Sequence, residues 1–393
     1  MSKKAVLAYS GGLDTSVAIK MLQLNYGYDV ITVTVDVGQN DDLKAIEDKA
    51  KEMGVIKHYT INAIDEFANE YITKCIKANG LYQGKYPLAT ALARPLIASK
   101  VVEIAKREDA TALAHGCTGK GNDQIRFDIT MRSLIDLPII APIREHNLTR
   151  DKEIEFVKEN NIKISVEAKK YSIDQNLWGR AIEGGVIEDE NMEVPDDAFS
   201  WVKIKDLPDE PFYMDIEFDN GIPISINDNS GSLAELIQYA NEEAGRNGVG
   251  IIDHIEDRTI GLKSREVYET PAALCIIEAH KDLEKLNLTR NELRFKELVD
   301  DEWSWLTYSG LWLDPLMNAL NSFIDKTQER INGKVKLKLY KGAMRVVGRE
   351  SRYSLYNKRL ATYGKDEFDQ RLAKGFVELW GLQSILANEV LKR

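Results

Sequence analysis

Cysteine is scarce in the sequence, and the spacing of its three cysteines excludes the usual sulfur-based sites. Cys75, Cys117 and Cys275 form no CxxC pair and have no histidine at zinc-site spacing. Neither a disulfide framework nor a structural metal site is therefore indicated. We interpret these side chains as small residues of the core.

The sequence also lacks a long apolar run and an excess of positive charge. No apolar run approaches the roughly 18 residues of a membrane-spanning helix, and residues 1–4 lead directly into the first expected strand, which leaves no room for a signal peptide. Lys and Arg number 52 against 63 Asp and Glu, so the net charge is −11. A chain this acidic is a poor general partner for nucleic acid or an anionic membrane. We expect a cytoplasmic protein that binds neither.

Two common phosphate-binding loops are missing as well. No stretch has the spacing GxxxxGK followed by Ser or Thr, and the glycine pair at 11–12 is followed by Leu13 and Asp14 rather than completing GxGxxG. The sequence has SGGxDxS instead, at residues 10–16, between an apolar strand-like run at 5–8 and an amphipathic helical pattern. A strand, a tight glycine turn and a helix are predicted there.

The chemistry of this first loop suits a phosphate group. Glycines without side chains let the backbone wrap an anion, the hydroxyls add donors, and the following helix presents the positive end of its dipole. A glycine turn followed by an ordinary helix cap is the alternative. The predicted phosphate site comprises Ala8, Tyr9, Ser10, Gly11, Gly12, Leu13, Asp14, Thr15 and Ser16.

The first 165 or so residues alternate strand and helix patterns, which predicts a doubly wound parallel sheet. The expected strands are 5–8, 30–35, 58–61 and 111–115, and the expected helices are 42–53, 63–77 and 92–106. Ligands in such sheets lie beyond the carboxyl ends of the strands. The loop at 36–39 would then lie near an adenine and ribose, although a simple turn explains it equally well.

Two further stretches in this half of the chain contain side chains that could bind a ligand. The loop after His115 brings three glycines together with donors, cations and a carboxylate. A helix entry could account for Asn122 and Asp123 as caps, but not for the whole cluster. In the stretch 86–95, Thr90 could cap the next helix and Arg94 could be a surface cation.

The pattern changes near residue 165 and predicts an α+β second domain. Residues 171–180 are polar and aromatic and follow no regular pattern. A hairpin at 212–226 and a helix from Leu233 to Ala244 are expected further along the chain. The charged run at 256–271 is readily explained as a solvated surface.

The C-terminal part is expected to contain a helix at 311–331, a hairpin at 335–347 and an amphipathic helix at 368–391. The last helix is so apolar that it must bury one face, and we expect a neighbouring subunit to cover it. The predicted domains are 1–165 for the nucleotide, 166–365 for the substrates and multimerisation, and 366–393 as the oligomerisation helix.

Five segments taken together closely resemble the argininosuccinate synthase family, over nearly the whole chain and in the same order. The first alone resembles the pyrophosphate loop of the N-type ATP pyrophosphatases, which have an adenine nucleotide alpha-hydrolase-like fold and cleave ATP between its α and β phosphates. The segments are AYSGGLDTS at 8–16, YPLATALARP at 86–95, HGCTGKGNDQIRF at 115–127, YSIDQNLWGR at 171–180 and KSREVYETPA at 263–272.

This resemblance implies a homotetrameric ligase of arginine biosynthesis that condenses citrulline with aspartate through a citrullyl-AMP intermediate, releasing AMP and pyrophosphate. It implies ATP with Mg²⁺ as co-substrate and no tightly bound prosthetic group or resident metal. Gly116 would join the ATP site; Thr118, Asn122 and Asp123 would bind aspartate; Tyr86, Asn122, Arg126, Ser172, Glu256 and Tyr268 would bind citrulline. Asp14, Asp123 and Arg126 are the implied catalytic residues. Where the family often has a serine, this chain has Ala181, which cannot hydrogen-bond.

Other functions remain open from the residues. A transfer RNA thiolase of the same superfamily would need a pair of reactive cysteines, and many amidating synthetases would need an amidotransferase domain with an N-terminal cysteine; neither is found here. A nucleotide-binding regulatory protein without turnover is the alternative from another class. The sequence also leaves open whether Asp14 binds Mg²⁺ or orders the loop.

Overall fold

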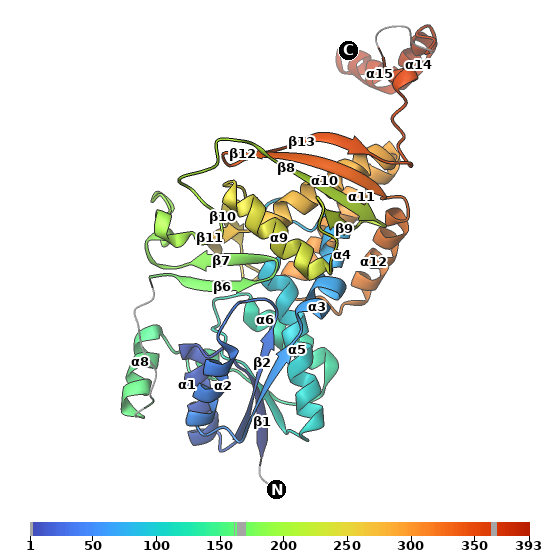
Figure 1. Ribbon diagram of the computed structural model, residues 1–393. Helices are drawn as coiled ribbons and strands as arrows, with labels where there is room; N and C mark the ends of the chain where they lie inside the picture. The colour runs from blue at the N-terminus through green and yellow to red at the C-terminus, as the bar shows by residue number, and fades with distance from the viewer. Residues whose placement is uncertain (1–2, 161, 163–169, 363–367) are drawn as a thin grey trace.

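The computed structural model describes residues 3–160, 162, 170–362 and 368–393. The blue N-terminal sheet lies at one end of the molecule, further sheets and helices pack above it, and the red C-terminal helices stand apart (Figure 1). None of the described helices is long and apolar enough to cross a bilayer.

The N-terminal region is built on a five-stranded sheet in the order β3-β2-β1-β4-β5, with every neighbouring pair parallel. Its central strand buries alternate residues on opposite faces: Ala5 and Leu7 belong to one apolar core, and Val6 and Ala8 to the other. The predicted doubly wound sheet is therefore confirmed. The strands are β1 (Lys4–Ala8), β2 (Asp29–Asp36), β3 (Lys57–Asn62), β4 (Ala112–Ala114) and β5 (Ile139–Ile140).

Helices cover both faces of this sheet. The expected helix at 63–77 is continuous but contains a π-helical segment, η1. The helices are α1 (Leu13–Leu24), α2 (Leu43–Glu52), α3 (Ile64–Glu66), η1 (Phe67–Ile72), α4 (Thr73–Lys77), α5 (Ala89–Arg107), α6 (Asp123–Leu134), α7 (Pro142–Glu145) and α8 (Arg150–Glu159).

Two antiparallel four-stranded sheets form the second region, in the orders β10-β11-β7-β6 and β13-β12-β8-β9. Both hairpins predicted from the sequence are confirmed as β8–β9 and β12–β13. The strands are β6 (Ser172–Asn176), β7 (Gly179–Glu183), β8 (Phe212–Asp219), β9 (Ile222–Ile226), β10 (Ile251–Asp257), β11 (Lys263–Glu269), β12 (Gly333–Tyr340) and β13 (Ala343–Glu350).

The irregular sequence pattern at 171–180 predicted no strand, yet β6 and β7 form a hairpin there. Asn176 shapes its turn: the side-chain oxygen accepts from the Trp178 N–H at 2.9 Å, and its amide donates to the Ala89 carbonyl at 2.9 Å. Trp178 is fully buried and donates its indole N–H to the Pro87 carbonyl. The turn is thus anchored to the start of α5.

The helices of the second region only partly follow the expectations. Ser232 caps α9 through a reciprocal capping box with Glu235, directly before the expected start of this helix at Leu233. The helix expected at 311–331 begins later, with Pro315 in its first turn, and α10 and α11 were not identified from the sequence. The elements are η2 (Gly185–Glu188), η3 (Asp196–Ala198), α9 (Leu233–Arg246), α10 (Pro271–Asn287), α11 (Arg290–Tyr308), α12 (Pro315–Gln328) and α13 (Lys358–Ala361).

A buried charge network joins α10 and α11 to the turn after α4. Lys296 is 1% exposed, and its Nζ lies 3.0 Å from Glu284 and 2.8 Å from Asp300. The Asn79 amide donates to both carboxylates, at 2.7 and 2.9 Å, and its oxygen lies 2.7 Å from Nδ1 of His280. The charges are compensated by one another and by these amide hydrogen bonds, as buried ions require.

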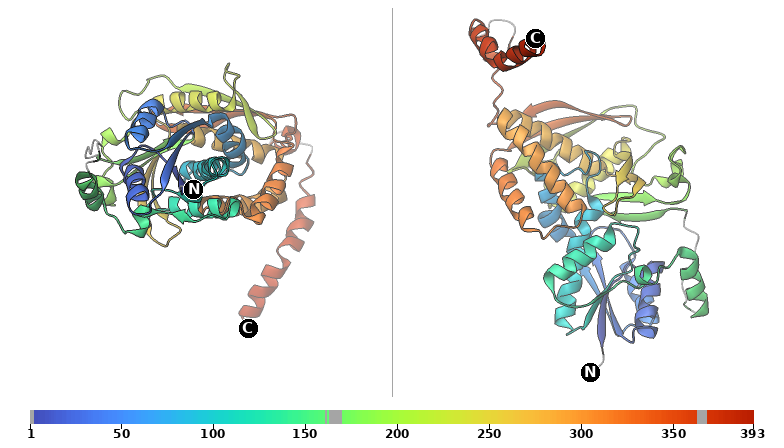
Figure 2. Two further views of the ribbon diagram at one scale, coloured as in Figure 1. Left: turned by 90° about the horizontal axis from the view of Figure 1, so that it is seen from below. Right: turned by 180° about the vertical axis from the view of Figure 1, so that it is seen from behind.

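The C-terminal helix expected at 368–391 is interrupted at Gly381, giving α14 (Leu372–Trp380) and α15 (Leu382–Leu391). Both stand away from the remainder of the molecule in every view (Figures 1 and 2). Neither helix contains a buried residue, and large apolar side chains such as Leu379 (77% exposed) and Trp380 (71%) face solvent. The described part of the chain does not cover this apolar surface.

Candidate functional site

The loop between β1 and α1 has the geometry of an anion site. Gly11 adopts a φ of +75°, and no side chain caps the N-terminus of α1. Ser10 and Gly12 are exposed, while Ser16 folds back so that its hydroxyl donates to the Gly12 carbonyl at 2.7 Å. The first-turn N–H groups are therefore left without side-chain acceptors and available to phosphate oxygens.

Gly116 places the loop after β4 directly against the phosphate loop. A Cβ at this position would lie 2.9 Å from Cγ2 and 3.1 Å from Cα of Thr15, so only glycine permits the approach. His115 fixes the start of the same loop: its Nδ1 accepts from the Cys117 N–H at 3.2 Å, and its Nε2 lies 2.7 Å from Asp128. The two loops meet because β1 and β4 are neighbours in the sheet.

Asp14 lies beside two residues of α8. An oxygen of Asp14 is 3.7 Å from the Arg150 guanidinium. Burial raises the pKa of Glu153 to about 8, and the adjacent Asp14 carboxylate adds to the shift. One oxygen of Glu153 is buried without a hydrogen-bond partner among the described residues. This carboxylate pair could take a cation that arrives with phosphate, although no cluster of three metal-binding side chains occurs in the described ranges.

A second cluster surrounds the buried carboxylate of Glu256. Tyr268 donates to one of its oxygens at 2.7 Å, and Tyr308 donates to the other. Tyr86 stacks on Tyr268 with ring centroids 4.2 Å apart. Burial, reinforced by Glu256, raises the pKa of both donating phenols, so they remain neutral donors. No ion pair joins Glu256 to any residue that the structure describes.

An ion-pair cluster lies next to it. Asp123 binds Arg126 at 3.0 Å and Arg94 at 2.8 Å, and Arg94 also contacts Asp174. Burial raises the pKa of Asp123, but the two guanidinium groups more than offset this and hold it below its ordinary value. Arg94 is therefore part of the cluster rather than a surface cation. Neither Arg94 nor Asp174 was among the residues predicted for the site.

Asn122 connects the two clusters. It occupies the cap position of α6 but makes no capping hydrogen bond, so that alternative was wrong. Its amide donates to the Tyr308 hydroxyl at 2.9 Å, and its oxygen accepts from the Thr259 N–H at 2.9 Å. Thr90 likewise does not cap α5; its N–H donates to the Tyr86 hydroxyl at 2.8 Å.

Two of the predicted residues have no described side-chain contact with these clusters. Thr118 and Ser172 are exposed, and neither side chain hydrogen-bonds within the described residues. Ala181 pairs with both Tyr268 and Asp174 in the sheet, so the missing serine would have faced this site. The loop at 36–39 packs on the β6–β7 turn, where the Leu177 N–H donates to the Val37 carbonyl at 2.9 Å.

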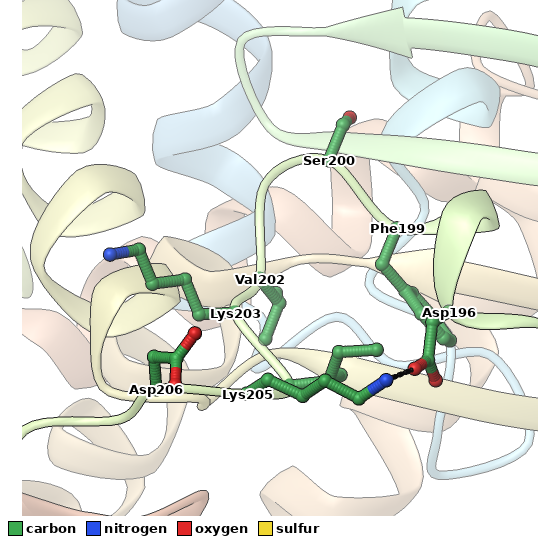
Figure 3. A pocket seen from close by; sticks show the side chains of 8 residues that line it. Asp196, Phe199, Ser200, Val202, Lys203, Lys205 and Asp206 are labelled. Atoms are coloured by element: carbon green, nitrogen blue, oxygen red, sulfur yellow. Dashed lines mark ion pairs between the residues drawn. The ribbon is translucent and has the colours of Figure 1, made fainter.

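A separate surface pocket of about 280 Å³ contains none of the predicted residues. Figure 3 shows the Lys205–Asp196 ion pair at its edge and the Lys203 side chain turned away from that pair. Its lining comprises Asp196, Phe199, Ser200, Val202, Lys203, Ile204, Lys205 and Asp206. It does not overlap the phosphate loop or the Glu256 cluster.

Comparison with known proteins finds one family over both halves of the chain. Residues 4–163 match the family model of the arginosuccinate synthase N-terminal HUP domain, and residues 171–387 match that of the arginosuccinate synthase C-terminal domain. The argininosuccinate synthase of Pyrococcus furiosus is 56% identical, with 99% of this chain and 95% of the relative covered.

Two further relatives carry the same name. The Methanocaldococcus jannaschii protein is 55% identical, with 100% of each chain covered, and the Saccharolobus solfataricus protein is 52% identical, with 98% of this chain and 99% of the relative covered. On the phosphate loop, the Glu256 cluster and these full-length matches, the chain belongs to the argininosuccinate synthase family of ATP-dependent ligases.

Proposed function

We propose that this protein condenses citrulline with aspartate at the site described above, through a citrullyl-AMP intermediate, releasing AMP and pyrophosphate. Glu256 is the observation that carries the proposal. It is a 3% exposed carboxylate whose oxygens each accept from a tyrosine, with no ion pair to a described residue. Such a buried charge calls for a cation, and the ammonium group of an amino acid supplies one.

The nucleotide would bind at Ala8 to Ser16 with Gly116, where free N–H groups and hydroxyls match the charge that develops on departing pyrophosphate. Mg²⁺ commonly takes one or two carboxylates together with substrate phosphates. Asp14 and Glu153 fit this role, and the ion would neutralise phosphate charge there.

The two amino acids would lie on either side of Asn122. Aspartate would use Thr118, Asn122 and Asp123. The Asp123–Arg126 ion pair supports placing the two amino acids in contact, as their condensation requires. Citrulline would use Tyr86, Asn122, Arg126, Ser172, Glu256 and Tyr268.

The chemistry needs positioning more than a protein nucleophile. A ureido carbon is a poor electrophile with no leaving group, so its oxygen would attack the α-phosphorus of ATP and become part of AMP. The aspartate amine would then displace AMP from that carbon. Within this scheme Asp14, Asp123 and Arg126 hold charges in place.

The product assay tests the reaction directly. Incubation with ATP, citrulline and aspartate should yield AMP and pyrophosphate in equal amounts, because the bond broken lies between the α and β phosphates. Chromatography of the nucleotides distinguishes AMP from ADP. Formation of ADP and phosphate would contradict the assignment, and ATP binding without turnover would favour a regulatory protein.

Gly12→Val tests the phosphate loop. Gly12 has an extended φ of −71°, and a Cβ there would meet only the Ser10 hydroxyl, at 3.4 Å, so the fold should tolerate valine. The branched side chain would occupy the approach of a phosphate to the backbone. ATP affinity, measured by calorimetry, should be abolished while the thermal unfolding midpoint is kept. Retained ATP affinity would show that the loop is only a turn.

Glu256→Gln tests the site of the ammonium group. Removing the charge should weaken citrulline binding by roughly 1.5–3 kcal/mol, about 10- to 150-fold in KM for citrulline. The KM for ATP should be unchanged in the citrulline-dependent exchange of labelled pyrophosphate into ATP. Glu266→Gln is a control on the neighbouring strand, because Glu266 is already paired with Arg258 at 2.8 Å. Equal citrulline KM values for the two variants would remove Glu256 from the site.

The proposed assembly is a homotetramer in the cytoplasm, with α14 and α15 seated on neighbouring subunits. Deleting residues 366–393 should convert the tetramer to smaller species, because it removes the uncovered apolar surface described above. Light scattering measures the mass, and Glu378→Gln on α14 controls for a change that leaves the apolar side chains in place. An unchanged mass after deletion would assign the helices to their own subunit.

A further inference from the structure

We propose that Tyr308, the last residue of α11, is a positioning residue that fixes the Glu256 carboxylate and couples the citrulline and aspartate sites. The proposal rests on the function proposed above and adds a residue that neither the sequence motifs nor the family resemblance assigned. Tyr308 is fully buried and follows Glu256 by 52 positions. It reaches the site from the end of α11, a helix that packs on α5 and α12.

The direction of the hydrogen bonds through Tyr308 follows from Asn122. The Asn122 oxygen already accepts from the Thr259 N–H, so the group facing Tyr308 is the amide NH₂, which can only donate. The Tyr308 hydroxyl must accept this bond and spend its single proton on Glu256. The Tyr308 hydroxyl thus accepts from Asn122 and donates to Glu256, so the hydrogen bonds run in one direction through the three side chains.

The backbone of Tyr308 holds a second predicted citrulline residue. Its carbonyl accepts from the Arg126 guanidinium twice, at 3.1 Å from Nε and 2.9 Å from Nη2. The guanidinium also lies 5.1 Å from the centre of the Tyr308 ring. Gly310 turns the chain at a φ of +81°, where a Cβ would come within 3.0 Å of Arg126. The end of α11 therefore presses directly on Arg126.

The Tyr308 ring is itself immobilised. Tyr82 stacks on it with centroids 3.5 Å apart and planes 7° from parallel, and Tyr86 meets it edge-on at 6.4 Å. Burial keeps the phenol protonated, because it raises its pKa and the Glu256 charge adds to that effect. The hydroxyl thus has one position and one protonation state with which to orient Glu256.

Tyr308→Phe removes this hydroxyl and preserves the stacked ring. One Glu256 oxygen and one Asn122 N–H then lose their partner, and the cost should fall on substrate binding. The KM for citrulline should rise about 10- to 100-fold, the KM for aspartate less, and the KM for ATP and kcat at saturation should stay within about twofold.

Tyr82→Phe is the matched control, because it deletes the same atom from the other ring of the stack. The Tyr82 hydroxyl donates to the Asp257 carbonyl at 2.7 Å and not to Glu256. All three KM values of this variant should remain near wild type. A citrulline KM for Tyr308→Phe equal to that of Tyr82→Phe would overturn the proposal, and so would a Tyr308→Phe chain that fails to fold.

A double-mutant cycle separates positioning from a merely structural effect. If Tyr308 acts through Glu256, then Tyr308→Phe should change the citrulline KM far less in the Glu256→Gln background than in the wild type. Additive effects would overturn the coupling. A wild-type protein without citrulline-dependent pyrophosphate exchange would instead refute the proposed function, so the two failures are distinguishable.

Discussion

An unpaired carboxylate at the junction of the two regions is the constraint on which the site depends. Glu256 sits on β10, yet its two hydrogen-bond donors come from β11 and from the end of α11. A buried anion is tolerated only if donors converge on it from fixed positions. Sheet and helix must therefore be docked correctly before both donors reach the carboxylate, so the same packing forms the fold and the cluster.

The segment from 115 to 128 connects this arrangement to the loop between β1 and α1, the proposed phosphate site. At its start Gly116 touches Thr15, and at its end Arg126 holds the Tyr308 carbonyl. The β10–β11 turn grips its middle, where Arg258 donates to the Lys120 carbonyl at 3.2 Å. One loop thus contacts both the proposed phosphate site and the clusters around Glu256 and Asp123. This suits the proposed reaction, in which the α-phosphorus of ATP must meet a ureido oxygen.

The sequence predicted those parts of the site that are encoded locally. The strand, glycine turn and helix at 5–24 follow from short-range patterns. The motif at 115–127 could be recognised because many hydrogen-bond donors lie close together in it. Tyr308 had no such signal, because it ends the charged helix α11 and its partners Asn122, Arg126 and Glu256 are distant in sequence. Arg94 was misjudged for the same reason: its partners Asp123 and Asp174 are distant in sequence. The β6–β7 hairpin had no clear strand signal because its residues do not alternate between apolar and polar: both Ser172 and Ile173 are exposed, whereas Asn176 is buried.

The buried charge network around Lys296 holds α11 firmly against α10 and the turn after α4. Asp300 fastens the helix to Asn79 and Lys296 fastens it to the Lys77 carbonyl. Tyr308 lies twelve residues after Lys296, about 18 Å along the axis at 1.5 Å per residue. A rigid helix converts a small rotation at its fastened part into a displacement at its tip. If Tyr308 positions Glu256 as proposed, substitutions at Lys296 or Asp300 would weaken substrate binding from a distance, although neither side chain contacts a substrate.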